Sequence, residues 1–141
     1  YDGIEFDSEL EMKYYRDVVI PKVKSGEIIY CELQKTYILQ PTFKPNGSKS
    51  SIQSIKYVAD FFLKYKDGHE EVIDTKGYPD AVAKIKRKLF LYKFPHINYH
   101  WICYSKIDGG WCEYDYVLRK RNERHSEKKL KQTKKELECN E

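Results

Sequence analysis

The segment from Tyr57 to Gly77, which reads YVADFFLKYKDGHEEVIDTKG, constrains the fold more than any other part of the chain. It contains two runs rich in Val, Ile, Phe and Tyr, residue types that favour strands, on either side of a Lys66-Asp67-Gly68 turn. Two strands joined by so short a turn pair as an antiparallel hairpin. The chain is therefore expected to fold around a sheet that contains this hairpin.

The length of the turn decides where the acidic side chains point. A three-residue loop with glycine in the left-handed position places Tyr65 opposite His69 and, counting back, Asp60 opposite Asp74. Opposed side chains lie on one face, with Cβ atoms about 4.5–5.5 Å apart. A two-residue Asp67-Gly68 loop would instead shift the register by one residue and turn Asp60 to the other face.

Lys76 shares a face with Asp74, because residues two apart in a strand point the same way. Under the three-residue register, two carboxylates and a lysine converge on one patch. Such hard oxygen ligands suit Mg²⁺ or Mn²⁺, so one interpretation is a divalent-metal site with a lysine beside it. The other is a structural ion pair between Asp60 and Lys76, because a buried carboxylate without a partner is costly.

The rest of the chain supplies helices and further strands. Ser8 and Glu11 form a capping-box pattern at the start of a helix whose Leu10, Tyr14 and Val18 would face the core. Pro21 is expected to end or kink this helix, and Gly26 is the clearer stop. Further strands are expected at 27–33, 37–40 and 97–104, with the hairpin strands at 52–65 and 70–76.

A second helix is expected from Asp80 to Tyr92, with one apolar stripe facing the core. The stripe consists of Val82, Ile85, Leu89 and Tyr92. Because this helix separates the second hairpin strand from the strand at 97–104, those two strands should pair in parallel through a crossover. The predicted fold class is α/β (α+β), a mixed β-sheet flanked by helices.

Composition and charge divide the chain in two. Its 141 residues suit one domain, and lysine plus arginine balance aspartate plus glutamate over residues 1–118. Residues 119–141 carry the whole net charge of +4 and are expected to form a charged helical tail. No apolar run could span a membrane, no signal peptide is evident, and four unclustered cysteines favour a reduced, cytoplasmic protein.

Read together, Glu11, Ala59-Asp60 and Asp74-Thr75-Lys76 follow the order of a known nuclease motif. The pattern resembles the PD-(D/E)XK nuclease superfamily, which includes restriction enzymes, phage exonucleases and archaeal Holliday-junction resolvases. The segments FDSELE, YVADF and DTKG are similar to a small phage-associated family within it, over residues 3–105. Ala59 stands where the motif has proline.

The resemblance implies a restriction-endonuclease-like fold and a role for each motif residue. Asp60 fills the first acid position, Asp74 the second and Lys76 the lysine position, while the carbonyl of Thr75 would be a further metal ligand. Glu11 resembles the acid that many members contribute from the N-terminal helix. Glu9 is the alternative for that position, and Glu11 could also serve only as a capping residue.

The implied activity is Mg²⁺- or Mn²⁺-dependent endonuclease cleavage of DNA in phage or mobile-element metabolism. Cleavage of branched DNA, such as a Holliday junction, would favour a homodimer. Lys84, Lys86 and Lys88 on the second helix are candidates to hold phosphates, although they could equally form a solvated face. The loop from Lys44 to Lys49 is another candidate DNA contact. The alternative function is a DNA-binding or assembly protein that keeps the fold without cutting.

Overall fold

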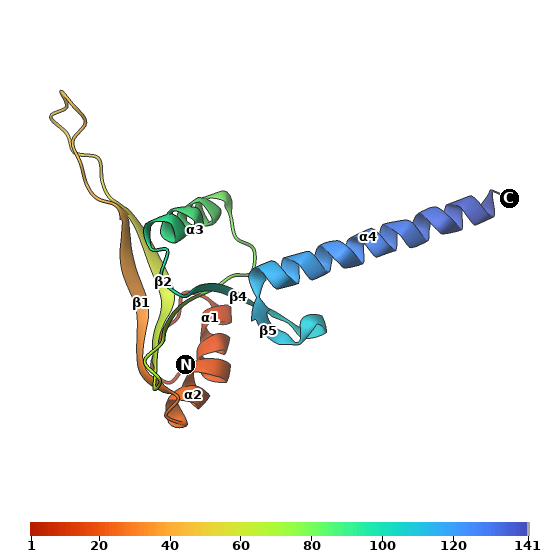
Figure 1. Cartoon of the computed structure of the whole chain (residues 1–141), viewed down its shortest axis with the longest axis horizontal. Coiled ribbons are helices and arrows are strands. Elements are labelled where there is room, and N and C mark those ends of the chain that lie inside the picture. The colour runs from red at the N-terminus through yellow and green to blue at the C-terminus, as the bar shows by residue number, and fades with distance from the viewer. Residues whose placement is uncertain (141) are drawn as a thin grey trace.

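The computed structural model describes residues 1–140 and contains a five-stranded mixed sheet flanked by helices (Figure 1). The strands, in spatial order, are β1 (Ile28–Gln40), β2 (Ile55–Tyr65), β3 (Glu70–Thr75), β4 (Tyr99–Ser105) and β5 (Gly110–Glu113). The helices are α1 (Glu9–Tyr14), α2 (Ile20–Lys24), α3 (Ala81–Lys93) and α4 (Tyr114–Cys139). Strands β3 and β4 pair in parallel and the other pairs are antiparallel, which confirms the mixed sheet and the crossover through α3.

The β2–β3 hairpin has the register of the three-residue turn. Phe61 pairs with Ile73, and the Tyr65 N–H donates to the His69 carbonyl at 2.9 Å. Gly68 adopts the left-handed conformation, with φ of 92°, that this turn requires. One step beyond the Phe61–Ile73 pair, this register brings Asp60 opposite Asp74, so the two acids lie on one face as predicted.

The N-terminal helical segment continues through Pro21 instead of ending there. A π-helical turn (Tyr15–Val19) joins α1 to α2, and the Ile20 N–H donates to the Tyr15 carbonyl. The wider turn immediately before proline accommodates a residue that has no N–H to donate. The segment stops before Gly26, whose φ is 80°, and Ser8 caps its start by accepting from the Glu11 N–H at 3.1 Å.

Strand β1 is continuous, whereas two strands separated at 34–36 were expected. Gln34 sits inside it with a left-handed φ of 55°. On either side of Gln34, Leu33 packs with the cluster that contains Phe61, while the Lys35 ammonium lies 3.8 Å from the ring centroid of Phe62. Neighbouring residues Phe61 and Phe62 point to opposite faces of the sheet, so Leu33 and Lys35 also point to opposite faces. In a regular strand these two side chains, two residues apart, would share a face. Gln34 therefore reverses the alternation of side chains along β1 without breaking the strand.

Helix α3 forms where expected but buries a different face. The stripe predicted to be buried is exposed, with Val82 at 59%, Ile85 at 57%, Leu89 at 38% and Tyr92 at 88%. Phe90 is fully buried instead, packed against the rings of Tyr37, Tyr57 and Tyr99. The helix is docked by this aromatic cluster of the sheet, which outweighs the more numerous aliphatic residues on the opposite side.

The core consists of two clusters, one on each face of β2. The first lies beneath the N-terminal helices and comprises Tyr14, Val19, Ile28, Phe61, Leu63, Tyr65 and Ile73. The second lies beneath α3 and comprises Leu39, Tyr57, Ala59, Phe62, Val72 and Phe90. Asp60 lies on β2 between Ala59 of the second cluster and Phe61 of the first, so packing on both faces of the sheet holds its backbone in place.

Helix α4 leaves the sheet and extends away from it (Figure 1). Val117 in its first turn is fully buried, whereas Leu130 and Leu137 are 65% and 64% exposed. The expected domain boundary at residue 118 thus falls inside one helix, at the point where its packing against the sheet ends. No helix within residues 1–140 is both long and apolar enough to cross a membrane.

Candidate active site

A cleft of about 330 Å³ opens between the first turns of α3 and the strands β2 and β3. Asp60 and Asp74 are buried in it, at 7% and 2% exposure, and the Lys76 side chain reaches it from the end of β3. The hairpin register brings the two acids side by side, and the crossover into α3 leaves the space above them open. Three of the four predicted catalytic residues therefore line one cleft.

Asp60 is held by the residue that follows Asp74. Its Oδ2 accepts hydrogen bonds from the Thr75 N–H at 2.8 Å and from the Thr75 hydroxyl at 2.9 Å. Burial raises the pKa of the Asp60 carboxyl to about 8, and the neighbouring charge of Asp74 adds to this effect. The carboxyl is fixed in place but has no cation of its own to favour its ionised form.

Asp74 lies beside Lys76, with 2.8 Å between Asp74 Oδ2 and the Lys76 ammonium. The distance is that of an ion pair, but the approach is too oblique for a directional hydrogen bond, so this buried oxygen has no hydrogen-bond partner. Unsatisfied buried oxygens are rare in folded proteins and are costly. Asp74 Oδ2 therefore has the charge of Lys76 beside it but no hydrogen-bond donor.

Glu11 joins this group and Glu9 does not. The Glu11 side chain is buried, and burial raises the pKa of its carboxyl, followed by the charge of Asp7 and, more weakly, that of Asp74. Glu9 is exposed and pairs with Lys13 at 3.0 Å on the outer side of the helix. Of the two alternatives for the helix acid, Glu11 is the one placed beside Asp60 and Asp74.

Gln34 is a further polar residue of the cleft that the sequence did not reveal. Its side-chain amide donates to Glu11 Oε2 at 3.0 Å. The left-handed backbone at Gln34, which costs about 1 kcal/mol for a residue other than glycine, lies at the level of Asp60 in the β1–β2 pairing. Nothing in the local sequence indicates this conformation, because no glycine or asparagine marks it.

A chain of hydrogen bonds approaches Asp74 from the aromatic core. The Trp101 indole N–H donates to the Tyr99 hydroxyl at 2.7 Å, which donates to the Tyr57 hydroxyl at 2.9 Å. Tyr57 lines the cleft, and burial followed by the charge of Asp74 raises the pKa of its hydroxyl. Tyr99 and Trp101 pack in or against the core and also support the wall of the cleft beside Asp74.

The three lysines of α3 that were predicted to hold phosphates separate into two groups. Lys86 lines the cleft, whereas Lys84 and Lys88 line a different hollow of about 530 Å³ between α3 and α4. Lys56, the second residue of β2, also lines the cleft. Lys86 and Lys56 are thus the lysines at the cleft whose position suits a phosphate contact.

The residues present fit a hydrated divalent ion better than a fully protein-enclosed one. No three His, Cys, Asp or Glu side chains within residues 1–140 are arranged to hold a metal ion on their own. Asp60, the orphaned Asp74 oxygen and the Thr75 carbonyl would leave the remaining positions to water. Mg²⁺ is usually bound in this way, through one or two carboxylates with several waters retained.

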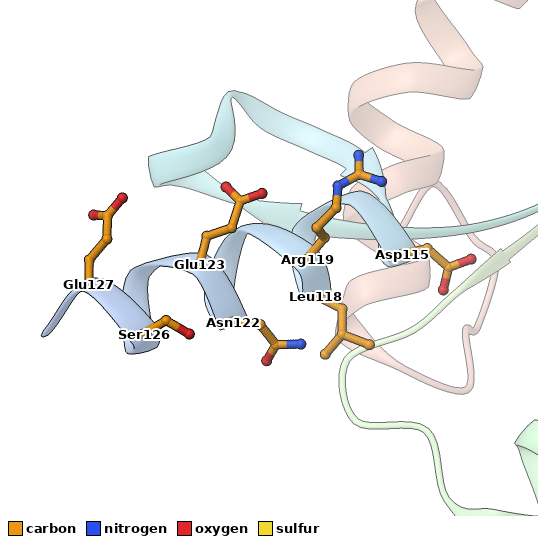
Figure 2. Close-up of a pocket in the computed structure, with 7 residues that line it drawn as sticks. All are labelled: Asp115, Leu118, Arg119, Asn122, Glu123, Ser126 and Glu127. Carbon is orange, nitrogen blue, oxygen red and sulfur yellow. The ribbon is translucent and has the colours of Figure 1, made fainter. Parts of the chain in front are cut away.

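A larger hollow, of about 580 Å³, runs along α4 (Figure 2). All of the residues that line it come from α4 itself: Asp115, Leu118, Arg119, Asn122, Glu123, Ser126 and Glu127. Because no second element faces them, the hollow is the side of one projecting helix and brings no groups together for chemistry.

Comparison with known proteins supplies a family. No curated protein and no solved structure matches the chain. One family model matches residues 1–108, which include every element from α1 to β4 and every residue that lines the cleft. The matched region stops before α4. The chain therefore belongs to the DUF1064 family, which is described as a protein of unknown function.

Proposed function

We propose that this protein is a metal-dependent DNA endonuclease that uses Mg²⁺ or Mn²⁺ to hydrolyse phosphodiester bonds in the cleft of Asp60, Asp74 and Lys76. The observation that carries the proposal is the buried pair of carboxyls at the cleft, in which one oxygen of Asp74 lacks a hydrogen-bond partner. The order of these residues along the chain, with Glu11 before them, supports it through the resemblance to PD-(D/E)XK nucleases.

Each residue has a role in this proposal. Asp60, fixed by Thr75, and Asp74 hold the ion, with the Thr75 carbonyl as a third ligand and Glu11 nearby. A bound divalent ion would polarise the phosphate and lower the pKa of a coordinated water. Lys76 orients the attacking water and stabilises negative charge that develops on the phosphate. Lys86 and Lys56 hold the neighbouring phosphates.

The substrate and setting follow from the resemblance. The proposed target is DNA of phage or mobile elements, in the cytoplasm of the host cell. In its most specific form, the proposal names branched DNA such as a four-way junction as the substrate. Resolution of a junction requires two cuts, so this form of the proposal includes a homodimer with one cleft in each subunit.

The test is cleavage of linear, circular and four-way-junction DNA in the presence of Mg²⁺ or Mn²⁺. We expect cleavage by the intact protein and its loss in the Asp74→Ala and Lys76→Ala variants. Glu9→Gln is the matched control, because Glu9 is an acid of the same region whose side chain is 75% exposed on the outer side of α1. Equal activity in Asp74→Ala, Lys76→Ala and Glu9→Gln would contradict the assignment of the cleft.

The rival function is DNA binding or assembly without cleavage. The ion pair of Lys76 with Asp74 favours it to a degree, since a lysine can neutralise an acid that no metal occupies. Under this alternative the intact protein binds DNA but cuts none of the three substrates with either ion. Retained binding with no cleavage would support the rival and reject the nuclease proposal.

A further inference from the structure

The connection between β1 and β2 forms a projecting arm, which we define as residues 41–54. It extends beyond the sheet and past α3 (Figure 1). Phe43 and Ile52 form a bridge across it, with N–H···O distances of 3.1 and 2.7 Å, and the Ser48 N–H donates to the Pro45 carbonyl at the tip. The arm therefore has a defined two-stranded conformation although no core residue lies within it.

The charge of the arm is uniform. From Leu33 to Ala59 the chain contains four lysines and no acidic residue, although acids and bases nearly balance over the whole sequence. The lysines are Lys35, Lys44, Lys49 and Lys56. Lys44 and Lys49 are exposed near the tip and take part in no ion pair within residues 1–140. An exposed basic projection of this kind attracts a polyanion.

The base of the arm adjoins the cleft. Lys56 lines the cleft and lies seven positions after Lys49, and seven steps of extended chain at about 3.3 Å each span on the order of 23 Å. Phosphates along one DNA strand are spaced about 3.4 Å apart along the helix axis. The tip therefore reaches phosphates roughly six or seven nucleotides from a bond held in the cleft.

The form of the arm selects double-stranded DNA. A two-stranded ribbon fits the major groove of B-DNA, which is about 12 Å wide. Proteins that grip single strands use several aromatic platforms for successive bases, whereas the arm has one aromatic residue, Phe43, and none at its tip between Lys44 and Ser51. We propose that the arm binds duplex DNA beside the cleft, with Lys44 and Lys49 on its phosphates. The location of the cleaved bond in the cleft rests on the proposed function.

The experiment measures DNA binding by fluorescence anisotropy in EDTA, where no metal-dependent cleavage can occur. The full-length protein and a Lys44→Ala/Lys49→Ala variant are titrated against a duplex of about 30 base pairs and a single strand of the same length. The matched control is Lys24→Ala/Lys66→Ala, which removes the same charge from exposed positions at the opposite end of the sheet.

We expect the arm variant to raise the Kd for the duplex about tenfold at ordinary salt, and to reduce the slope of log Kd against log salt by about 1.8, or about 0.9 for each lost phosphate contact. The control variant and the single strand should show less than about a threefold change. Equal weakening by both variants, or no weakening by the arm variant, would overturn the proposal.

These binding measurements, taken together with the cleavage assay, separate this proposal from the nuclease activity. A protein that cuts no DNA but loses duplex binding in the arm variant retains the arm as a DNA-binding element without hydrolysis. If the protein cuts DNA and binds it equally well with and without Lys44 and Lys49, the DNA-binding role of the arm is rejected and the nuclease proposal stands. Each outcome rejects one proposal and leaves the other standing.

Discussion

The acidic residues of the cleft and those at the base of α4 differ in the positive charge around them. At the base of α4, Asp108 accepts from both terminal nitrogens of Arg124, at 2.7 and 3.2 Å, and Asp115 accepts from both of Arg87, at 3.1 and 2.6 Å. These hydrogen bonds lower the pKa of both carboxyls. Each acid here is matched by one arginine, and the pairs join α4 to the rest of the fold.

In and beside the cleft, three buried carboxyls have only one cation near them. Among the described residues, only Lys76 forms an ion pair with any of Glu11, Asp60 and Asp74. Burial raises the pKa of Asp60 to about 8 instead of lowering it. A group of acids that served only the fold would be neutralised as Asp108 and Asp115 are. Ionising these buried acids together is a cost to the fold that a bound cation would relieve.

The largest expected difference between the two regions is in activity. Replacing Asp74 by Asn removes a proposed metal ligand while keeping the shape of the side chain, and we expect cleavage to fall by a factor on the order of 10²–10³ or more. Asp108→Asn should stay within about twofold of the intact protein, because the Asp108 side chain hydrogen-bonds only to Arg124 and Ser105 and does not line the cleft. Initial cleavage rates under identical conditions provide the measurement. Similar losses in both variants would mean that the effect reports folding.

The second largest expected difference between the cleft and the base of α4 is in the effect of a divalent ion on stability. A ligand that binds only the folded state stabilises it by about 2.7 kcal/mol at a hundred times its Kd. We expect Mn²⁺ or Mg²⁺ to raise the free energy of unfolding of the intact protein and of Asp108→Asn, and to have no such effect on Asp74→Asn. Urea unfolding with and without the ion measures this. Stabilisation of Asp74→Asn equal to that of the intact protein would place the ion elsewhere.

The two regions should also respond to pH in opposite directions. The folded pKa of Asp60, about 8, lies above its unfolded value of about 3.9, so its contribution to stability is full below pH 4 and is lost as pH rises to 8. Glu11, whose pKa is also raised, acts in the same direction. The lowered pKa of Asp115 has the opposite effect, since its contribution is lost only as pH falls below about 4.

We therefore expect the metal-free protein to become more stable between pH 8 and pH 5, by at most about 1.4 kcal/mol per pH unit for one proton. Asp60→Asn should flatten this dependence, because asparagine can keep the bonds from Thr75 but does not titrate. Urea unfolding at a series of pH values in EDTA provides the measurement. A dependence that is as steep in Asp60→Asn as in the intact protein would show that another group causes it.

The parts of this site that depend on local chemistry could be predicted from the sequence. The Lys66-Asp67-Gly68 turn fixes the hairpin register through the left-handed glycine, and the register alone brings Asp60 opposite Asp74. Lys76 follows from the two-residue period of a strand. The crossover through α3 follows from the order of the elements. All of these inferences involve residues within one hairpin or its immediate neighbour.

The parts that depend on distant packing could not be predicted. The buried side of α3 is chosen by the aromatic residues of β1, β2 and β4, so the periodicity of α3 alone indicated the wrong face. The choice between Glu9 and Glu11 depends on how Tyr14 packs against Phe61 and turns the helix. The left-handed backbone of Gln34 lies between the Leu33–Phe61 and Lys35–Ala59 pairs of β1 with β2, and the neighbouring sequence carries no sign of it.

Gln34 provides the smallest effect and the sharpest test of how the cleft is organised. Gln34→Asn keeps the side-chain amide and introduces a residue that tolerates the left-handed backbone, but the shorter side chain no longer reaches Glu11 Oε2. We expect cleavage to fall by up to about tenfold, with stability changed by only about 1 kcal/mol, the net value of one hydrogen bond.

The matched control is Gln40→Asn, the same chemical change at the last residue of β1. Rates for both variants are measured over a range of Mn²⁺ concentrations, with unfolding in urea alongside. If Glu11 contributes to the metal site, Gln34→Asn needs more Mn²⁺ for half-maximal activity and Gln40→Asn does not. If both variants match the intact protein, Glu11 acts only as the capping-box partner of Ser8, and Asp60 and Asp74 are left as the only acidic ligands of the cleft.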